Sequence, residues 1–202
     1  MKKIMIATVL ILMVLPLSAT DFRIGPCLGY VFTPQAMPTS ETDSGVYTKP
    51  AGGFNLSLHG LFVFEFTDST FKGGVDFAAS FISFPVGGDG DLFHRPLEQG
   101  GGRIGIAIVY PVIEEDLELA LAVGSVLIVQ EHKAQDGSFN SVISTGPYFD
   151  AMAHIIFDNF GLGVGFGGEM LYPIAYHIDD IDSPMKFGEY ALYAHVGVFY
   201  RF

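Results

Sequence analysis

The sequence predicts an all-β fold, an eight-stranded antiparallel up-and-down transmembrane β-barrel that follows an N-terminal signal peptide. Half of the 202 residues are hydrophobic and 16% are charged, yet no apolar run after residue 19 is long enough to span a membrane as a helix. Hydrophobic residues instead alternate with polar ones in eight segments. Short and long connections alternate between these segments, as an up-and-down barrel requires.

The beginning of the chain has the features of a secretory signal peptide. Lys2 and Lys3 precede an apolar run over residues 4–17, and small residues follow it as a cleavage site. The run is shorter than the roughly 20 residues that a transmembrane helix needs. We therefore expect residues 1–19 to be cleaved and residues 20–202 to form the barrel domain.

The first four predicted strands carry an apolar, uncharged residue at every second position. Their ranges are 22–32, 54–66, 71–81 and 103–110. In the second strand, for example, Leu56 and Leu58 stand on either side of Ser57. One face of each strand is therefore suited to lipid and the other to a polar interior.

The last four predicted strands continue the pattern. Their ranges are 117–129, 143–157, 161–172 and 188–202. Residues 126–129 are apolar on both faces, so the register of that strand stays open there. The eight lipid-facing rows contain no charged residue, and a charge on that face costs about 2–4 kcal/mol at the bilayer midplane. A soluble β-sandwich also alternates but needs no charge-free ring, so the barrel is the preferred interpretation.

The connections between the predicted strands fall into two classes. The short ones are residues 67–70, 113–116 and 158–159, and the long ones are residues 33–50, 85–102, 131–141 and 173–187. With an even strand count, this alternation puts both termini and the short turns on the periplasmic side. The long loops are then extracellular.

The last strand ends in Tyr200, Arg201 and Phe202. A C-terminal Phe that closes an apolar row resembles the signal by which bacterial outer-membrane barrels are recognised for insertion. In architecture, the chain resembles the small outer-membrane barrels of the OmpA, OmpX and OmpW type over essentially its whole mature length. The resemblance implies the bacterial outer membrane as location, with outer-membrane lipid and the barrel assembly machinery as partners. Tyr200 and Phe202 are the expected assembly signal.

Inward positions predict a polar plug in the lumen. An eight-stranded barrel is just wide enough for its own side chains, so a porin-like channel is not expected. The polar cluster expected at middle depth consists of His59, Asp76, Asp150, His154, Glu169 and His195. We interpret these residues as groups that satisfy one another's hydrogen bonds. A proton-coupled or metal-binding lumen is the alternative, but residues spaced over different strands are no metal signature, and no cofactor is expected.

Four glycines leave one inner wall of the barrel without side chains. They are Gly161, Gly163, Gly165 and Gly167. We expect large rings from neighbouring strands, Tyr148, Tyr193 and Phe199, to cover this wall. The alternative is that the row lines a conduit.

The expected loops are acidic, and we expect them to form the functional surface. The formal net charge of −12 argues against nucleic acid as a partner. Asp179, Asp180 and Asp182 in the last long loop carry oxygens that suit a divalent cation, although they lack the Gly and terminal Glu spacing of an EF-hand. His177 has no Ser in a triad arrangement beside these aspartates, so we do not expect an enzyme.

Two functional hypotheses follow. The first is a surface-exposed barrel with a structural or external-binding role, in adhesion, host contact or lipid contact, whose acidic loops meet an extracellular partner or divalent cations. The alternative is OmpW-like passive transport of small hydrophobic molecules across the outer membrane.

Overall fold

The chain forms a closed antiparallel barrel of eight strands, together with a separate pair of very short strands. The computed structural model describes residues 21–32, 37–38, 47–48, 53–66, 69–84, 97–114, 116–133, 139–177 and 189–202. The prediction of an all-β, eight-stranded antiparallel barrel is confirmed. The predicted signal peptide, residues 1–19, lies outside these ranges. Within them, no helix is long and apolar enough to cross a membrane.

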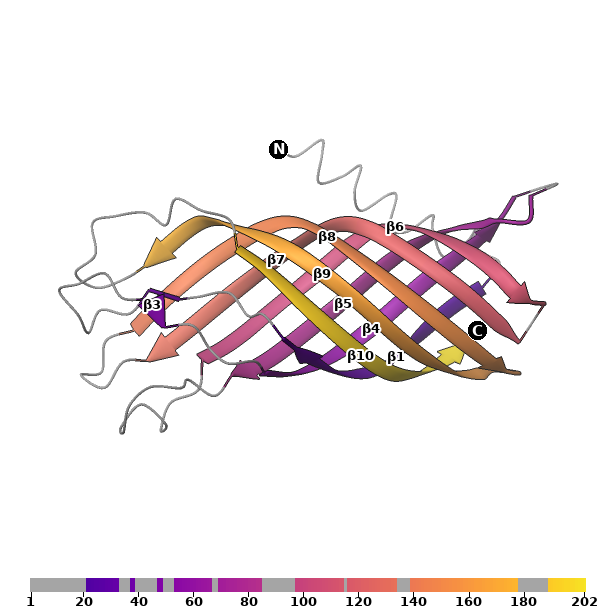
Figure 1. The fold of residues 1–202 in the computed structure, drawn as a ribbon, viewed down its shortest axis with the longest axis horizontal. Coiled ribbons are helices and arrows are strands. Elements are labelled where there is room, and N and C mark those ends of the chain that lie inside the picture. The colour runs from indigo at the N-terminus through magenta and orange to yellow at the C-terminus, as the bar shows by residue number, and fades with distance from the viewer. Residues whose placement is uncertain are drawn as a thin grey trace.

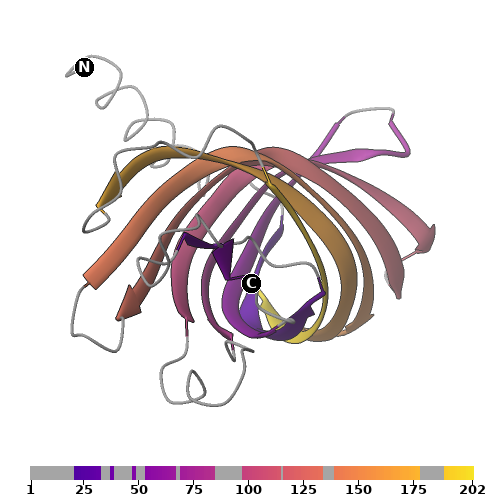
Figure 2. The same ribbon diagram turned by 60° about the vertical axis from the view of Figure 1, so that its left-hand side comes forward.

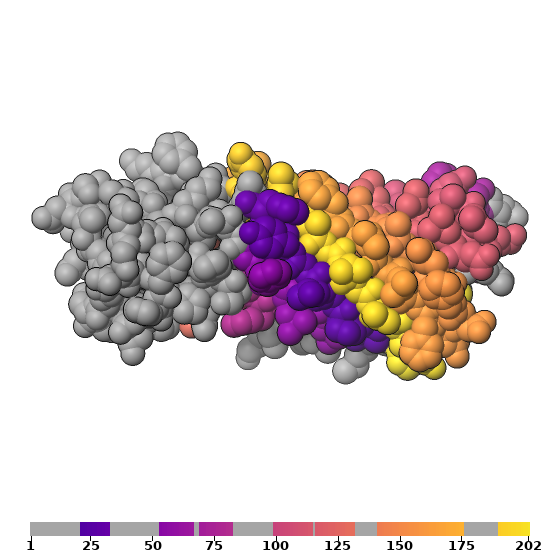
Figure 3. All heavy atoms as spheres, turned by 60° about the horizontal axis from the view of Figure 1, so that its bottom comes forward, coloured from indigo at the N-terminus to yellow at the C-terminus, as the bar shows by residue number. Residues whose placement is uncertain are grey.

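Consecutive barrel strands pair with one another, and the first strand closes the ring against the last (Figures 1 and 2). The barrel strands are β1 (Asp21–Val31), β4 (Gly53–Glu65), β5 (Lys72–Phe84), β6 (Leu97–Ile113), β7 (Leu117–Lys133), β8 (Phe139–Phe157), β9 (Phe160–His177) and β10 (Glu189–Arg201). Figure 3 shows the closing pair, with β1 in indigo beside β10 in yellow. The short strands β2 (Met37–Pro38) and β3 (Tyr47–Thr48) pair inside the first long connection.

Five of the barrel strands, β5 to β9, are longer than the sequence pattern predicted, and the difference is largest in β6 to β9. β6 to β9 contain 17, 17, 19 and 18 residues. The expectation that residues 97–102, 131–133, 139–141 and 173–177 belong to loops was wrong. These residues lack clear apolar alternation, but backbone N–H and C=O groups pair whether or not the side chains beside them are apolar. Gly101, for example, pairs with Ser80 on one side and Ile128 on the other.

The two faces of the sheet have the predicted character. Outward residues such as Ile106 are exposed, at 69%, whereas inward residues such as Val109 are fully buried. In the stretch of β7 whose register stayed open, Val126 and Ile128 face the lumen and Leu127 faces outward. The outer surface is thus a broad apolar band, which is the surface that a bilayer requires.

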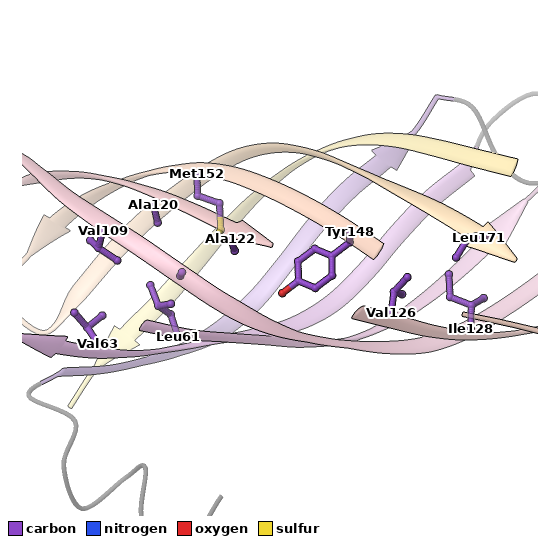
Figure 4. Close-up of a cluster of buried hydrophobic side chains, with 11 residues drawn as sticks. Leu61, Val63, Val109, Ala120, Ala122, Val126, Ile128, Tyr148, Met152 and Leu171 are labelled. Atoms are coloured by element: carbon purple, nitrogen blue, oxygen red, sulfur yellow. The ribbon is translucent and has the colours of Figure 1, made fainter. Parts of the chain in front are cut away.

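Buried apolar side chains fill much of the lumen, in addition to the polar groups that the sequence predicted. Figure 4 shows Leu61 and Val109 on one side of Tyr148, and Ile128 and Leu171 on the other. The interior is therefore layered, with polar groups held between apolar ones.

Candidate functional site

A polar cluster in the middle of the lumen is centred on Arg103 of β6. The guanidinium donates hydrogen bonds to the carboxylate of Asp150 and to the hydroxyl of Tyr193, and its Nε lies 3.6 Å from Oδ2 of Asp76. The rings of Tyr148 and Tyr193 flank it, with centroids 5.2 Å and 5.5 Å from Cζ. Two fully buried aspartates thus share one cation, as buried charges require.

Each of these aspartates also contacts a histidine. Nε2 of His59 is hydrogen-bonded to Asp76, and Nε2 of His195 lies 3.1 Å from Oδ1 of Asp150. The hydroxyl of Tyr148 donates to Asp76 over 2.7 Å. We call this group the central cluster; it consists of His59, Asp76, Arg103, Tyr148, Asp150, Tyr193 and His195. Its contacts join β4, β5 and β6 to β8 and β10, so they cross the lumen.

Nearer the short turns, a second set of ion pairs surrounds Arg23 of β1. We call it the basal cluster; it consists of Asp21, Arg23, Lys72, Glu118, His154 and Arg201. Nη2 of Arg23 lies 2.5 Å from both Asp21 Oδ2 and Glu118 Oε2. Nη1 of Arg23 lies 3.2 Å from Nδ1 of His154. With Lys72 3.2 Å from Glu118 Oε1, the basal cluster fills this part of the lumen with compensated charge.

The predicted polar cluster is therefore not a single group. His59, Asp76, Asp150 and His195 come together, whereas His154 belongs to the basal cluster and Glu169 makes no hydrogen bond or ion pair with another described residue. Arg103, the first residue of the fourth predicted strand, was not among the residues predicted for the cluster. The missing signal was charge balance, because two inward aspartates at one depth need a cation.

The glycine row is covered by rings. Each ring lies across from its glycine: Phe199 over Gly161, His154 over Gly163, His195 over Gly165 and Tyr193 over Gly167. A Cβ at Gly161 or Gly165 would lie 2.1 Å or 2.2 Å from the ring atoms. Of the expected rings, Tyr193 and Phe199 take this position, whereas Tyr148 lies against Gly105 instead. The bare wall is thus filled at these levels.

The expected assembly signal lies on the outer surface. Phe202 is 70% exposed, its ring centroid is 4.6 Å from that of Tyr200, and its backbone N–H donates to the carbonyl of Phe22 over 2.9 Å. Asp179, Asp180 and Asp182 lie outside the described residues. Among the described residues, no group of three or more His, Cys, Asp or Glu side chains is placed to hold a metal ion.

Between the central cluster and the long connections, the lumen contains a small polar chamber. Its volume is about 30 Å³, and Asn55, Ser57, Arg103, Glu169 and Tyr193 are among its lining residues. A space of this size holds one or two water molecules. The side-chain oxygen of Asn55 is buried without a hydrogen-bond partner, which fits a hydrated chamber.

The ladder between β8 and β9 is interrupted beside this chamber, although the two backbones stay close: a Cβ at Gly146 would lie 1.8 Å from the carbonyl oxygen of Met170. The register of β8 and β9 pairs Thr145 with Tyr172 and Tyr148 with Glu169, but gives Gly146 and Pro147 no partner on β9. Pro147 has no N–H to donate to the ladder. We call this interruption the β8–β9 gap.

A groove of about 600 Å³ lies on the outer surface at the β8–β9 gap. Its apolar walls are formed by Ile106, Val123, Phe149, Met170, Tyr190 and Leu192, and Pro147 also lines it. Glu169 lines both the groove and the chamber. We call this feature the lateral groove. An apolar space of this volume is typical of a binding site for a small molecule.

A second Gly-Pro pair interrupts the ladder between β1 and β10. Here Ile24 pairs with Tyr200 and Cys27 with Gly197, while Gly25 and Pro26 have no partner on β10. The cavity beside this interruption holds about 20 Å³ and is lined by side chains of the basal and central clusters. A Gly-Pro pair therefore interrupts the ladder in both places. On β1 it lies beside a filled part of the lumen, and on β8 it lies beside the lateral groove.

The fold and the apolar outer surface define the class of this protein: it has the fold of the small eight-stranded outer-membrane β-barrels. The barrel is similar to OprG of Pseudomonas aeruginosa, with a TM-score of 0.58 and 12% identity over 92% of this chain and 97% of that one. It is also similar to Ail of Yersinia pestis, solved with the heparin analogue sucrose octasulfate, with a TM-score of 0.50 and 16% identity over 90% and 97%. No family model matches the chain, and no curated protein matches it.

Proposed function

We propose that this barrel resides in the bacterial outer membrane and lets small hydrophobic molecules pass sideways between the extracellular half of its lumen and the bilayer. Its termini and short turns face the periplasm and its long loops face the exterior, because each connection at the loop end is longer than the turns before and after it in the chain. The fold shared with OprG and Ail supports the location.

The filled lumen argues against a straight pore. The central cluster joins opposite walls at mid-height, and the basal cluster occupies the end nearer the short turns. Water-filled passage through both would require several buried ion pairs to separate, and breaking a buried pair costs about 3–5 kcal/mol. A solute that enters the upper lumen therefore has its easiest exit through the wall.

The observation that carries the proposal is that Glu169 lines both the chamber and the lateral groove, beside the β8–β9 gap. Where ladder partners are missing, β8 and β9 separate with fewer hydrogen bonds to break. The groove outside the gap offers apolar walls on which a hydrophobic solute loses its contact with water.

The test is Pro147→Val, which gives this outward-facing position a backbone N–H. We expect uptake of a hydrophobic solute by proteoliposomes to fall, with the barrel still shifting its mobility on boiling in dodecyl sulphate. Pro26→Val is the matched control, because it makes the same change at the other interrupted ladder, beside the filled part of the lumen. Equal uptake by all three proteins would rule out the proposed exit.

The external-binding role is the second candidate, and the charge of the chain favours it. The sequence contains 22 acidic and 10 basic residues, and the acidic side chains include Asp179, Asp180 and Asp182. A variant with Asn at these three positions tests the role. Reduced calcium binding by whole cells that display it would support binding through the loops, and unchanged binding would count against it.

A further inference from the structure

Glu169 differs from the other carboxylates of the lumen. Asp76 and Asp150 share Arg103, and Glu118 lies between Arg23 and Lys72. Glu169 makes no hydrogen bond or ion pair with another described residue. Its neighbours in the register are Tyr148 on β8 and Ala191 on β10, and neither of them supplies a cation.

The surroundings of Glu169 make an unpaired carboxylate costly. Val126 lines the same chamber as Glu169, and Figure 4 shows it next to Tyr148, with Leu171 farther along the lumen. A carboxylate out of bulk water either takes up a proton or pairs with a group of opposite charge. Arg103 lines the same chamber but is already engaged by Asp76 and Asp150. Among the residues that the structure describes, no cation is left over for Glu169, and a ligand is able to provide one.

The lateral groove determines which chemical group the ligand carries besides its positive charge. Its walls are apolar, its volume of about 600 Å³ admits a short hydrocarbon chain, and it meets the chamber at Glu169. A molecule with an apolar chain in the groove and a positive head at the gap would satisfy both features. The net charge of −12 also raises the local concentration of cations around the protein and lowers that of anions.

We propose that Glu169 is a specificity-determining residue that selects single-chain alkylammonium compounds, whose ammonium pairs with its carboxylate while the chain lies in the lateral groove. This inference rests on the proposed function, because the ammonium reaches Glu169 through the β8–β9 gap. Fatty-acid anions of the same length are rejected, because their carboxylates would meet Glu169 without a free cation between them.

The experiment compares octylammonium, octanol and octanoate by equilibrium dialysis at neutral pH against nanodiscs with and without the full barrel. The three probes share a chain and differ in the head. We expect the wild-type barrel to bind octylammonium about tenfold or more tightly than octanol, the gain of one charge-assisted hydrogen bond, and octanoate most weakly. In Glu169→Gln, octylammonium should fall to the affinity of octanol, with octanol binding unchanged.

Glu114→Gln is the matched control, since Glu114 is an exposed residue of the turn that follows β6 and lies outside the groove. It should bind all three probes like the wild type. Equal binding of octylammonium and octanol by the wild type, or a preference that persists in Glu169→Gln, would overturn the inference while the groove itself stands. If no probe binds above the level of empty nanodiscs, the proposed function fails as well.

Discussion

The imidazole of His195 occupies the place that a side chain at Gly165 would take. A Cβ at Gly165 would lie 2.2 Å from Nε2 of His195, the same atom that contacts Asp150 over 3.1 Å. The ring is also held by its neighbours, with its centroid 5.9 Å from that of Tyr193 and 6.2 Å from that of His59. The absence of a side chain on β9 thus positions a polar contact of the central cluster.

Gly165→Ala should therefore destabilise the barrel. The new methyl group displaces His195 from Asp150, and overpacking of this kind costs about 1–3 kcal/mol. Urea unfolding in detergent micelles measures the change. Gly163→Ala is the control, because a Cβ there would lie 3.3 Å from the nearest atom of His154 and needs only a small adjustment. If Gly165→Ala lowers the free energy of unfolding no more than Gly163→Ala does, the ring of His195 moves aside without cost, and the prediction is wrong.

Replacement of Arg103 should be the most damaging single change in the lumen. Arg103→Leu leaves Asp76 and Asp150 buried without their shared cation, at a cost of about 3–5 kcal/mol in the free energy of unfolding. Adding Asp76→Asn and Asp150→Asn should restore part of the loss. Arg201→Leu is the control: Arg201 is about one-third exposed and pairs with Asp21 at 3.0 Å, so we expect a loss of about 1 kcal/mol or less. A loss for Arg103→Leu no larger than the control would contradict the central role of Arg103.

The outward rows were predictable from the sequence because side chains of a strand alternate strictly between its two faces. Which inward residues meet was not predictable, because contacts across the lumen depend on the stagger of all eight strands. Arg103 and Tyr193 are 90 positions apart and share a hydrogen bond. The two Gly-Pro pairs make the same point, since only their surroundings in the barrel distinguish the gap beside the lateral groove from the one beside the filled lumen.

The side-chain contacts in the lumen predict how well the barrel conducts ions. Because the central and basal clusters both fill it, the purified protein should give no porin-like conductance in a planar bilayer. A bilayer that receives the same detergent without protein is the control. Long-lived discrete openings would show that the clusters separate readily, and they would favour passage along the barrel axis over sideways exit.

Deletion of Phe202 should reduce outer-membrane assembly far more than it reduces stability. The residue contributes one backbone hydrogen bond to Phe22 and an exposed ring beside Tyr200, so its removal costs the folded barrel only about 1–3 kcal/mol. The proposed loss is one of recognition, and the amount of protease-resistant, heat-modifiable barrel in isolated outer membranes measures it. Phe160→Ala is the matched control, because Phe160 is another exposed ring, 58% exposed, with its centroid 5.0 Å from that of Tyr200. If both variants assemble to the same extent, the ring at position 202 contributes only surface contacts; if only the deletion fails to assemble while the refolded protein keeps its stability in urea, the terminal aromatic acts as the assembly signal.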